Sequence, residues 1–274
     1  MDRVEQMERN QEDLGHLFAR LDDLAARSAK GEVAISPFFS PREQYFAERY
    51  LKKSGVRAVA FGGISEAERK RIYVLPDYIE WADGATLPET LCDFGFSTEI
   101  SAIRVRGSGY RALSHRDFLG SLLGLGLLRS VIGDILLIGE EQREAVVVCE
   151  RGIVPFLEAH LERVGNDKVS LSCVDEETLA SLSASRRMMP ISDTVASARL
   201  DCVVAALCRL SREKARDCVE CELVELDFET ETRPDHTVTA PAILSVRGVG
   251  RYRIISLEEK TKKGRLRLLA EKYE

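Results

Sequence analysis

The sequence predicts an α+β protein in which an amphipathic helix is followed by three small α/β units. Its 274 residues are enough for two or three modest domains, and 45% hydrophobic with 31% charged residues is the balance of an ordinary globular protein. Short runs with helical and with strand periodicity alternate along the chain and are separated by Gly, Pro and Ser. The expected divisions are a helix in 1–35, an α/β unit in 36–98, a second unit in 99–180 and a third in 181–274.

The N-terminal region begins with leucines and a phenylalanine at helical spacing, from Leu14 to Leu24, which predicts an amphipathic helix. Ser40 followed by Pro41 is typical of an N-cap and first helical position, so a second helix should begin there and end near Gly55. Strands are expected over 56–61 and 72–75, with a short helix over 65–70 between them.

The middle region alternates strand-like and helical patterns. Strands are expected over 100–106, 135–138, 145–148 and 168–174, with one helix capped by Ser114 and another over 152–164. This β-α-β-β-α-β order is that of a ferredoxin-like plait. Many RNA-binding domains with this fold stack bases on aromatic side chains of the sheet, but strand 144–149 carries no aromatic residue. Base stacking of that kind is therefore not expected.

The last region is expected to pair two helices with a sheet. Ser197 is the expected cap of the first helix, with Leu200, Val203, Val204 and Leu207 on one face, and Ser211 caps a second helix over 212–220. Strands are expected over 223–228, 242–246, 252–257 and 265–269.

The net charge of −6 argues superficially against nucleic acid, but the charge is unevenly distributed. Positions 247–267 hold eight basic residues and two acidic ones, and a phosphate backbone responds to such a local patch more than to the sum. No unbroken apolar run reaches the roughly 18–20 residues that cross a bilayer, and the N-terminus has no signal-peptide pattern. A cytoplasmic protein without membrane contact is expected.

Basic residues of the helix pair are the principal candidates for RNA binding. Arg212 and Lys214 fall in the first helical turn, where free N–H groups and the helix dipole favour a phosphate. Two base-rich segments with glycines, 247–253 and 260–265, predict turns that RNA can approach closely. The expected phosphate groove is lined by Arg199, Ser211, Arg212, Lys214, Arg216, Arg247, Arg251, Arg253, Lys262, Lys263 and Arg265.

The sequence offers little support for a catalytic or a metal-binding site. The seven cysteines are scattered, and the pair Cys218 and Cys221 lacks the further ligands of a tetrahedral site. His115-Arg116-Asp117 lacks the asparagine of a kinase catalytic loop, and Ser114 with Asp117 is better interpreted as a helix cap. No cofactor, no metal and no catalytic residue are expected.

Several sequence blocks resemble a known family. Residues 198–216 are similar to the RNA-binding domain named for the fourth small-subunit ribosomal protein, called the S-four domain below. Further blocks match the pattern of YlmH-type proteins, from about residue 36 to the end of the chain. These blocks are Ser40 to Tyr45, Phe61 to Gly63, Ala67 to Arg71, Leu75 to Tyr78, His115 to Gly126, Ile132 to Ile135 and Thr261 to Arg265.

The resemblance implies a bacterial three-part protein with an N-terminal α/β unit, an RNA-binding plait and a C-terminal S-four domain. It also implies association with ribosomal or transfer RNA on the large ribosomal subunit, in the rescue and quality control of stalled translation. The sequence departs from the family pattern where the family usually has a glycine followed by a basic hairpin. This chain has acids there instead, namely Glu222, Glu225, Asp227, Glu229 and Glu231. These acids repel phosphate, so the RNA contact is expected at the second helix and the last two strands.

The sequence thus predicts a monomeric, non-catalytic factor that binds rRNA or tRNA through backbone phosphates. One alternative is an RNA-modifying enzyme such as a pseudouridine synthase, to whose aspartate motif Arg199-Leu200-Asp201 is superficially similar. Another is an adaptor for division or ribosome assembly, which predicts an exposed apolar patch on the 1–30 helix. The blocks around Arg42, Arg69 and His115 could contact a ribosomal surface or hold the domains together.

Overall fold

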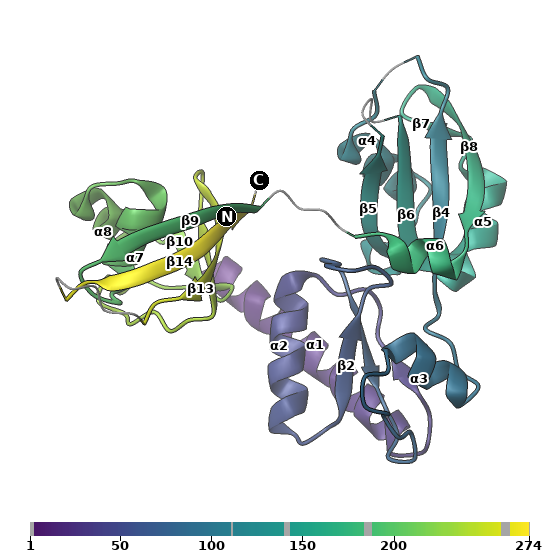
Figure 1. Cartoon of the computed structure of the whole chain (residues 1–274), viewed down its shortest axis with the longest axis horizontal. Helices are drawn as coiled ribbons and strands as arrows, with labels where there is room; N and C mark the ends of the chain where they lie inside the picture. Colours follow the sequence, from purple (N-terminus) through teal and green to yellow (C-terminus); the bar gives the residue numbers. More distant parts are fainter. Residues whose placement is uncertain (1–2, 111, 140–142, 184–187, 259–263, 274) are drawn as a thin grey trace. The chain divides into compact units, whose positions relative to one another are not determined.

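The computed structural model divides into two compact units, residues 1–184 and 185–274, and each is described by itself (Figure 1). It describes residues 3–110, 112–139, 143–183, 188–258 and 264–273, with the side chains described from residue 13 onward. Lys262 and Lys263, two of the expected phosphate ligands, lie outside the described residues. Within the described residues, no helix is long and apolar enough to cross a membrane.

The first part of unit 1 is a three-stranded antiparallel sheet, in the order β1-β3-β2, with helices packed on it. Its elements are α1 (Arg3–Ser28), β1 (Ala34–Ile35), α2 (Pro41–Lys53), β2 (Ala58–Phe61), β3 (Arg71–Val74) and α3 (Leu87–Asp93). Ser40 caps α2 in a capping box with Glu43, which confirms the predicted start of this helix. Leu17, Leu21 and Leu24 of α1 are buried. The apolar patch that the adaptor alternative expects on this helix is therefore not exposed in its described part.

The prediction of a short helix over residues 65–70 is wrong. This segment forms turns, and Lys70 makes an isolated antiparallel β-bridge with Phe39. The backbone at Gly62 lies so close to Ala67 that a Cβ atom added to Gly62 would be 2.4 Å from the Cβ atom of Ala67. Gly63 has φ +87°, a conformation that residues with side chains rarely adopt. The helical spacing of residues 65–70 could not reveal this tight passage.

The second part of unit 1 is a five-stranded sheet in the order β5-β6-β4-β8-β7, whose four long strands have the ferredoxin-like arrangement. Every pairing in it is antiparallel. Its elements are β4 (Ile100–Gly107), α4 (His115–Gly124), η1 (Arg129–Val131), β5 (Ile132–Ile138), β6 (Glu144–Glu150), η2 (Arg151–Ile153), α5 (Val154–His160), β7 (Arg163–Val164), β8 (Asp167–Val174) and α6 (Glu176–Ser181). The helix expected over 152–164 is shorter than predicted, because the chain leaves it at Leu161 for the hairpin of β7 and β8.

The two faces of this sheet are covered by different parts of unit 1. One face packs against α4 and α5 through a core that includes Phe118, Leu122 and Leu157. The opposite face packs near Ile100 and Val148 against a second cluster, to which Phe38, Ile64, Ala67 and Leu179 contribute. The N-terminal part therefore covers one end of the face on which RNA-binding plaits stack bases.

Arg69 and Asp134 hold the N-terminal part against the plait. The Arg69 guanidinium donates to the carbonyl oxygens of Phe38 at 2.8 Å, Ile132 at 3.0 Å and Arg129 at 3.1 Å. The Asp134 carboxylate accepts hydrogen bonds from the backbone N–H groups of Glu68 at 2.6 Å and Arg69 at 3.1 Å. Burial lowers the pKa of Arg69, although Glu43 and Asp134 oppose this. Of the two roles considered for the block around Arg69, the structure assigns it the structural one.

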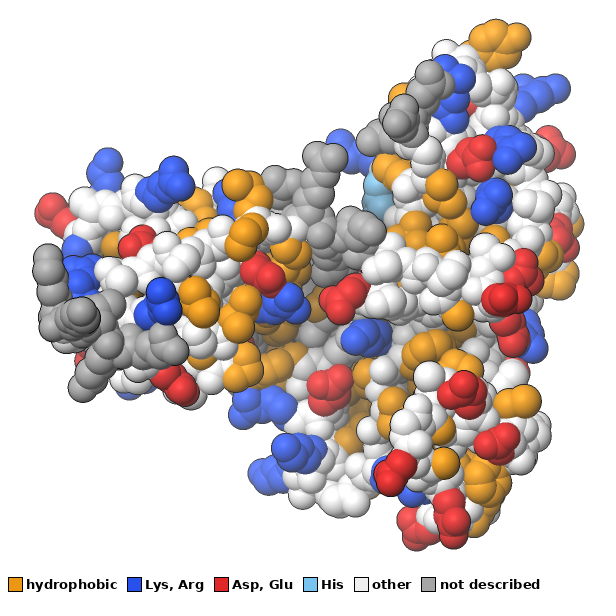
Figure 2. Space-filling model, in the orientation of Figure 1, with side chains coloured by type: hydrophobic (Ala, Val, Ile, Leu, Met, Phe, Trp, Pro, Cys, Tyr) orange, Lys and Arg blue, Asp and Glu red, His pale blue; other side chains and the backbone are white. Residues whose placement is uncertain are grey.

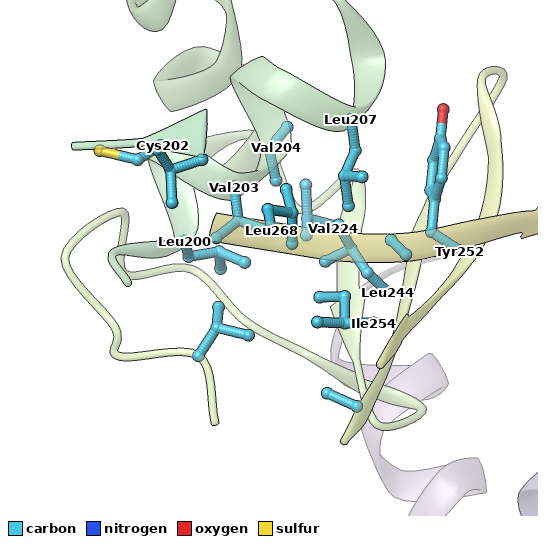
Figure 3. Packing of buried hydrophobic residues seen from close by; sticks show 14 of the residues in the cluster. Leu200, Cys202, Val203, Val204, Leu207, Val224, Leu244, Tyr252, Ile254 and Leu268 are labelled. Atoms are coloured by element: carbon cyan, nitrogen blue, oxygen red, sulfur yellow. The ribbon is translucent and has the colours of Figure 1, made fainter. Parts of the chain in front are cut away.

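Unit 2 is a six-stranded antiparallel sheet, in the order β11-β10-β12-β13-β14-β9, with two helices on one face. Its elements are β9 (Met188–Val195), α7 (Leu200–Cys208), α8 (Arg212–Glu220), β10 (Val224–Leu226), β11 (Glu229–Thr230), β12 (Ala242–Val246), β13 (Gly250–Ser256) and β14 (Leu266–Tyr273). Figure 3 shows leucine and valine side chains of α7 facing those of the sheet. The predicted cap of α7 is wrong by two residues, since Arg199 rather than Ser197 is the N-cap, and β9 was not predicted.

Candidate nucleic-acid interface

The strongest candidate site is a group of arginines around the carboxylate of Asp201 in unit 2. Arg199 donates to both carboxylate oxygens of Asp201, at 3.1 Å from Nε and 2.9 Å from a terminal nitrogen. Arg212 approaches the same carboxylate at 3.5 Å. The Asp201 side chain is only 3% exposed, whereas those of Arg199 and Arg212 are 42% and 59% exposed. The buried acid thus holds two guanidinium groups at the surface.

The fold brings these residues together because α7 and α8 form a tight helix pair. Leu200, Val203, Val204 and Leu207 of α7 are buried in the core, as their spacing predicts. Arg209 ends α7 in the left-handed conformation, with φ +54°, and Ser211 caps α8 by accepting a hydrogen bond from the backbone N–H of Lys214. The N-terminal turn of α8 is therefore at the surface, with Arg212 and Lys214 exposed on it.

Electrostatics place Arg216 in the same group. Its guanidinium donates to Glu220 at 2.7 Å, and this bond is the main reason that its pKa is raised. Asp201 and Arg199 also act on its charge, the first raising and the second lowering its pKa. Arg216 follows Arg212 by four residues in α8, so the two lie on one face of that helix. Burial of Asp201 opposes its ionisation, but hydrogen bonds with Arg199 and Cys202 and the charges of Arg212 and Arg199 hold its pKa below the ordinary value. We call Arg199, Arg212, Lys214 and Arg216 the helix-pair cluster.

The expected residues of the last strands do not join this cluster. Tyr252 and Ile254 of β13 are buried beneath the helices, so Arg251 and Arg253, which alternate with them, point to the other face of the sheet. There Arg253 pairs with Glu271 at 2.5 Å, and the Arg251 guanidinium lies 5.8 Å from the centre of the Phe228 ring. The single groove is thus corrected to two surfaces, because strand alternation divides the arginines between the helix-covered face and its opposite.

Two further candidates lie at the ends of these strands. Arg247 is exposed in the turn between β12 and β13, where Gly248 has φ +79°. Arg265 precedes β14 and donates to the hydroxyl and carbonyl oxygens of Thr194, at 3.1 and 2.6 Å. These bonds tie Arg265 to the edge strand β9.

The acidic segment after α8 forms the hairpin of β10 and β11. Glu222, at the position where the family usually has glycine, has φ +60°, so this chain places a side chain in a conformation that favours glycine. Asp227 and Phe228 in the hairpin turn also have positive φ, as a two-residue turn of this kind requires. The Asp227 carboxylate accepts a hydrogen bond from the backbone N–H of Ile243 at 2.9 Å and so ties the hairpin to β12.

Residues considered for catalysis or metal binding have structural partners. Ser114 and Asp117 form a capping box at the start of α4, as predicted. Asp201, the residue of the pseudouridine-synthase-like motif, is the buried partner of two arginines. Among the described residues, no group of three or more His, Cys, Asp or Glu could hold a metal ion.

The chain is similar to known proteins in sequence and in structure. Residues 94–178, which include the plait, match the family model described as "Putative RNA-binding domain in YlmH". Over 242 residues the chain is 32% identical to the ribosome-associated protein quality control protein P2 of Bacillus subtilis (strain 168), covering 88% of this chain and 87% of that protein. A solved structure, the cell division protein ylmH from Streptococcus pneumoniae, is 21% identical with a TM-score of 0.47, over 61% of this chain and 92% of that one.

Fold and site together define an α+β protein that joins a ferredoxin-like plait to a separate unit with an arginine cluster. The extent and identity of the match to the B. subtilis protein identify the family. The chain belongs to the YlmH family.

Proposed function

We propose that this chain is a ribosome-associated factor that binds structured RNA, either rRNA or tRNA on the large subunit, and acts by binding rather than by catalysis. The observation that carries the proposal is the helix-pair cluster, in which a buried acid orients arginines at a helix N-terminus. Family membership supports an RNA-binding, ribosome-associated role in quality control. Action on stalled translation, as a cytoplasmic monomer, is part of the proposal. Unit 2 would be the S-four-type domain that residues 198–216 resemble.

The chemistry of the cluster suits a phosphate backbone. A guanidinium has five N–H donors, and Asp201 engages only some of those of Arg199, while the side chains of Arg199 and Arg212 remain substantially exposed. Free N–H groups in the first turn of α8 add a positive dipole end beside Arg212 and Lys214. Because Asp201 already fixes Arg199, less side-chain entropy is lost when a phosphate binds.

The second surface, with Arg251 and Arg253, is proposed as an additional contact, and Arg247 and Arg265 at the ends of the strands are proposed as further phosphate ligands. Lys262 and Lys263, which lie outside the described residues, remain candidates from the sequence alone. Since the second surface lies on the opposite face of the sheet from the helix-pair cluster, one RNA strand cannot lie flat along both surfaces. RNA would have to pass around an edge of unit 2 to contact both.

In unit 1, Arg104 and Arg106 of β4 lie at the end of the plait face that is remote from Ile100, and Arg106 pairs with Glu144 at 2.8 Å. They offer the plait a modest phosphate contact of its own.

The test compares two double variants of the full chain in RNA binding at several salt concentrations. Arg212→Ala with Arg216→Ala removes two guanidinium groups of the cluster, each paired with one carboxylate. Arg27→Ala with Arg151→Ala removes two exposed arginines of unit 1 that are paired in the same way. If two phosphate contacts are lost, the slope of log affinity against log salt should become shallower by about 1.4–1.8 in the first variant and stay unchanged in the second.

Equal slopes in the two variants would refute the helix-pair cluster as the phosphate site. In that case Arg251→Ala with Arg253→Ala would show whether the opposite sheet face binds RNA instead. Nucleoside analysis of RNA incubated with the chain is expected to show unchanged bases. A new modified nucleoside would favour the RNA-modifying alternative.

A further inference from the structure

Four large aromatic side chains lie exposed around α3 in unit 1. Tyr78 and Trp81 are in the loop after β3, and Phe94 and Phe96 follow the end of α3. Tyr78 is 49% exposed and each of the other three is 38% exposed. The rings of Tyr78 and Phe94 lie 6.2 Å apart, so the two segments meet on one surface. We call these four residues the aromatic surface.

Polar contacts hold two of these rings in place. The Tyr78 hydroxyl donates to the carbonyl oxygen of Gly31 at 2.9 Å, and Trp81 Nε1 donates to that of Ala85 at 3.1 Å. Beneath them Ile79, Leu87 and Leu91 are buried in one core cluster. Because their polar atoms are already bonded to backbone, the rings offer their apolar faces to a partner at little cost in entropy.

The same segment carries a concentrated negative charge. Residues 72–103 contain six acidic residues and no lysine or arginine, so this segment has a net charge of −6. The whole chain has the same net charge. Asp77, Glu80, Asp83 and Asp93 are exposed and have no hydrogen-bond or ion-pair partner among the residues that the structure describes. The neighbouring Arg57 donates to the carbonyl oxygens of Pro76 and Ile79. Figure 2 shows acidic side chains, with hydrophobic ones between them, gathered where Figure 1 places α3.

Charge decides which partner fits this surface. Unpaired carboxylates repel both an RNA backbone and an anionic membrane, and they give an uncharged apolar partner nothing to pair with. A lysine or arginine side chain instead satisfies both features, since its cation is attracted to an aromatic face and to a carboxylate. We propose that the aromatic surface docks a protein segment rich in lysine and arginine. This role is separate from RNA binding and does not depend on the helix-pair cluster.

The chain carries its own reporter for this proposal, because Trp81 is its single tryptophan. The probe is a peptide of about fifteen residues made of Lys, Arg, Gly and Ala, titrated into the full chain while tryptophan emission is followed. A shifted or quenched emission that saturates is expected. A peptide of the same length with Glu in place of Lys and Arg should leave the emission unchanged.

Two triple variants with the same change in net charge make the test specific. Asp77→Asn, Glu80→Gln and Asp83→Asn neutralise the aromatic surface, whereas Glu48→Gln, Glu162→Gln and Glu177→Gln neutralise exposed acids elsewhere in unit 1. Three weak surface ion pairs together correspond to about a tenfold loss of peptide affinity, expected only in the first variant. Equal affinities in the two variants, or no binding to the wild-type chain, would overturn the proposal.

The aromatic contribution is tested with a fluorescein-labelled form of the same peptide. Trp81→Phe keeps an aromatic face and should retain most of the affinity, whereas Trp81→Ala should lose several-fold. Equal peptide affinity of the two variants would show that the aromatic ring of Trp81 does not contribute to binding.

Sedimentation of the chain alone and flotation with phosphatidylserine vesicles complete the test. A self-association or vesicle binding that the Asp77, Glu80 and Asp83 variant abolishes would assign the surface to a second copy or to a membrane instead.

Discussion

Replacing Asp201 by Asn removes a negative charge from beneath Arg199 and Arg212 while leaving the shape of the side chain nearly unchanged. Asp201 receives two hydrogen bonds from Arg199 and lies 3.5 Å from Arg212, with its own side chain almost fully buried. The amide of Asn can accept only one of the two bonds from Arg199, and its NH2 group then faces a second donor. The arginines lose the charge that holds them in place.

The expected cost follows from this geometry. A hydrogen bond to a charged group contributes about 1.5–3 kcal/mol, but Arg199 and Arg212 are 42% and 59% exposed, and solvent screens part of that energy. We therefore expect the free energy of unfolding of unit 2 to fall by about 1–2.5 kcal/mol. For a domain of this size, each kcal/mol lowers Tm by about 4–8 °C.

Hydrogen exchange of the full chain, measured by mass spectrometry, separates this effect from unit 1. Faster exchange is expected in α7, α8 and β14, with exchange in residues 13–183 unchanged. A loss below about 0.5 kcal/mol, or an equal loss in both units, would refute the assigned role of the acid. A matched control is Glu213→Gln, which neutralises an exposed acid of α8.

The same variant should alter the response to acid. Since the pKa of Asp201 in the folded chain is below its ordinary value of 3.8, its ionised form stabilises unit 2 fully above that value. This contribution is lost as the pH falls through the lower folded value. The stability difference between wild type and Asp201→Asn should therefore shrink below about pH 4.

Three further substitutions test the account of stability. Thr90→Val should stabilise unit 1 by about 1 kcal/mol in urea unfolding, because the buried Thr90 hydroxyl has no hydrogen-bond partner in the described structure. Arg69→Lys should destabilise unit 1 by about 2–4 kcal/mol, since one ammonium group cannot reach all three carbonyl oxygens, while RNA affinity stays unchanged. Glu222→Gly should raise the Tm of unit 2 by relieving about 0.5–1 kcal/mol at φ +60°, and an unchanged or lower Tm would show that the side chain compensates for its conformation.

Local signals predicted much of the fold. Ser40, Ser114 and Ser211 are all N-caps at the predicted positions, because capping chemistry depends on residues within one turn. The α+β class and the β-α-β-β-α-β order were also recovered from short periodic runs. Strand β9 was missed because its residues do not alternate in polarity and Pro190 interrupts them, which only an edge strand tolerates.

The site was predictable in its residue types but not in its arrangement. The basic character of residues 199–216 is visible in the sequence, and the structure gathers Arg199 and Arg212 around one carboxylate. That Asp201 is the centre could not be read from the sequence, because burial of a single acid depends on how α7 packs. The alternation of Arg251, Tyr252 and Arg253 shows that the arginines share a face, but only tertiary structure shows which face the helices cover.

Net charge is a poor guide to the partners of this chain, because its two notable surfaces have opposite sign. Outside residues 72–103 the acids and bases balance, so the overall −6 reflects one aromatic and acidic segment of unit 1. The helix-pair cluster belongs to unit 2. If each surface has its own partner, neutralising Asp77, Glu80 and Asp83 should weaken binding of the basic peptide without weakening that of RNA. Removing Arg212 and Arg216 should have the reverse effect. A variant that loses both ligands together would show that the two surfaces act as one site, and the separation argued from their charges would fail.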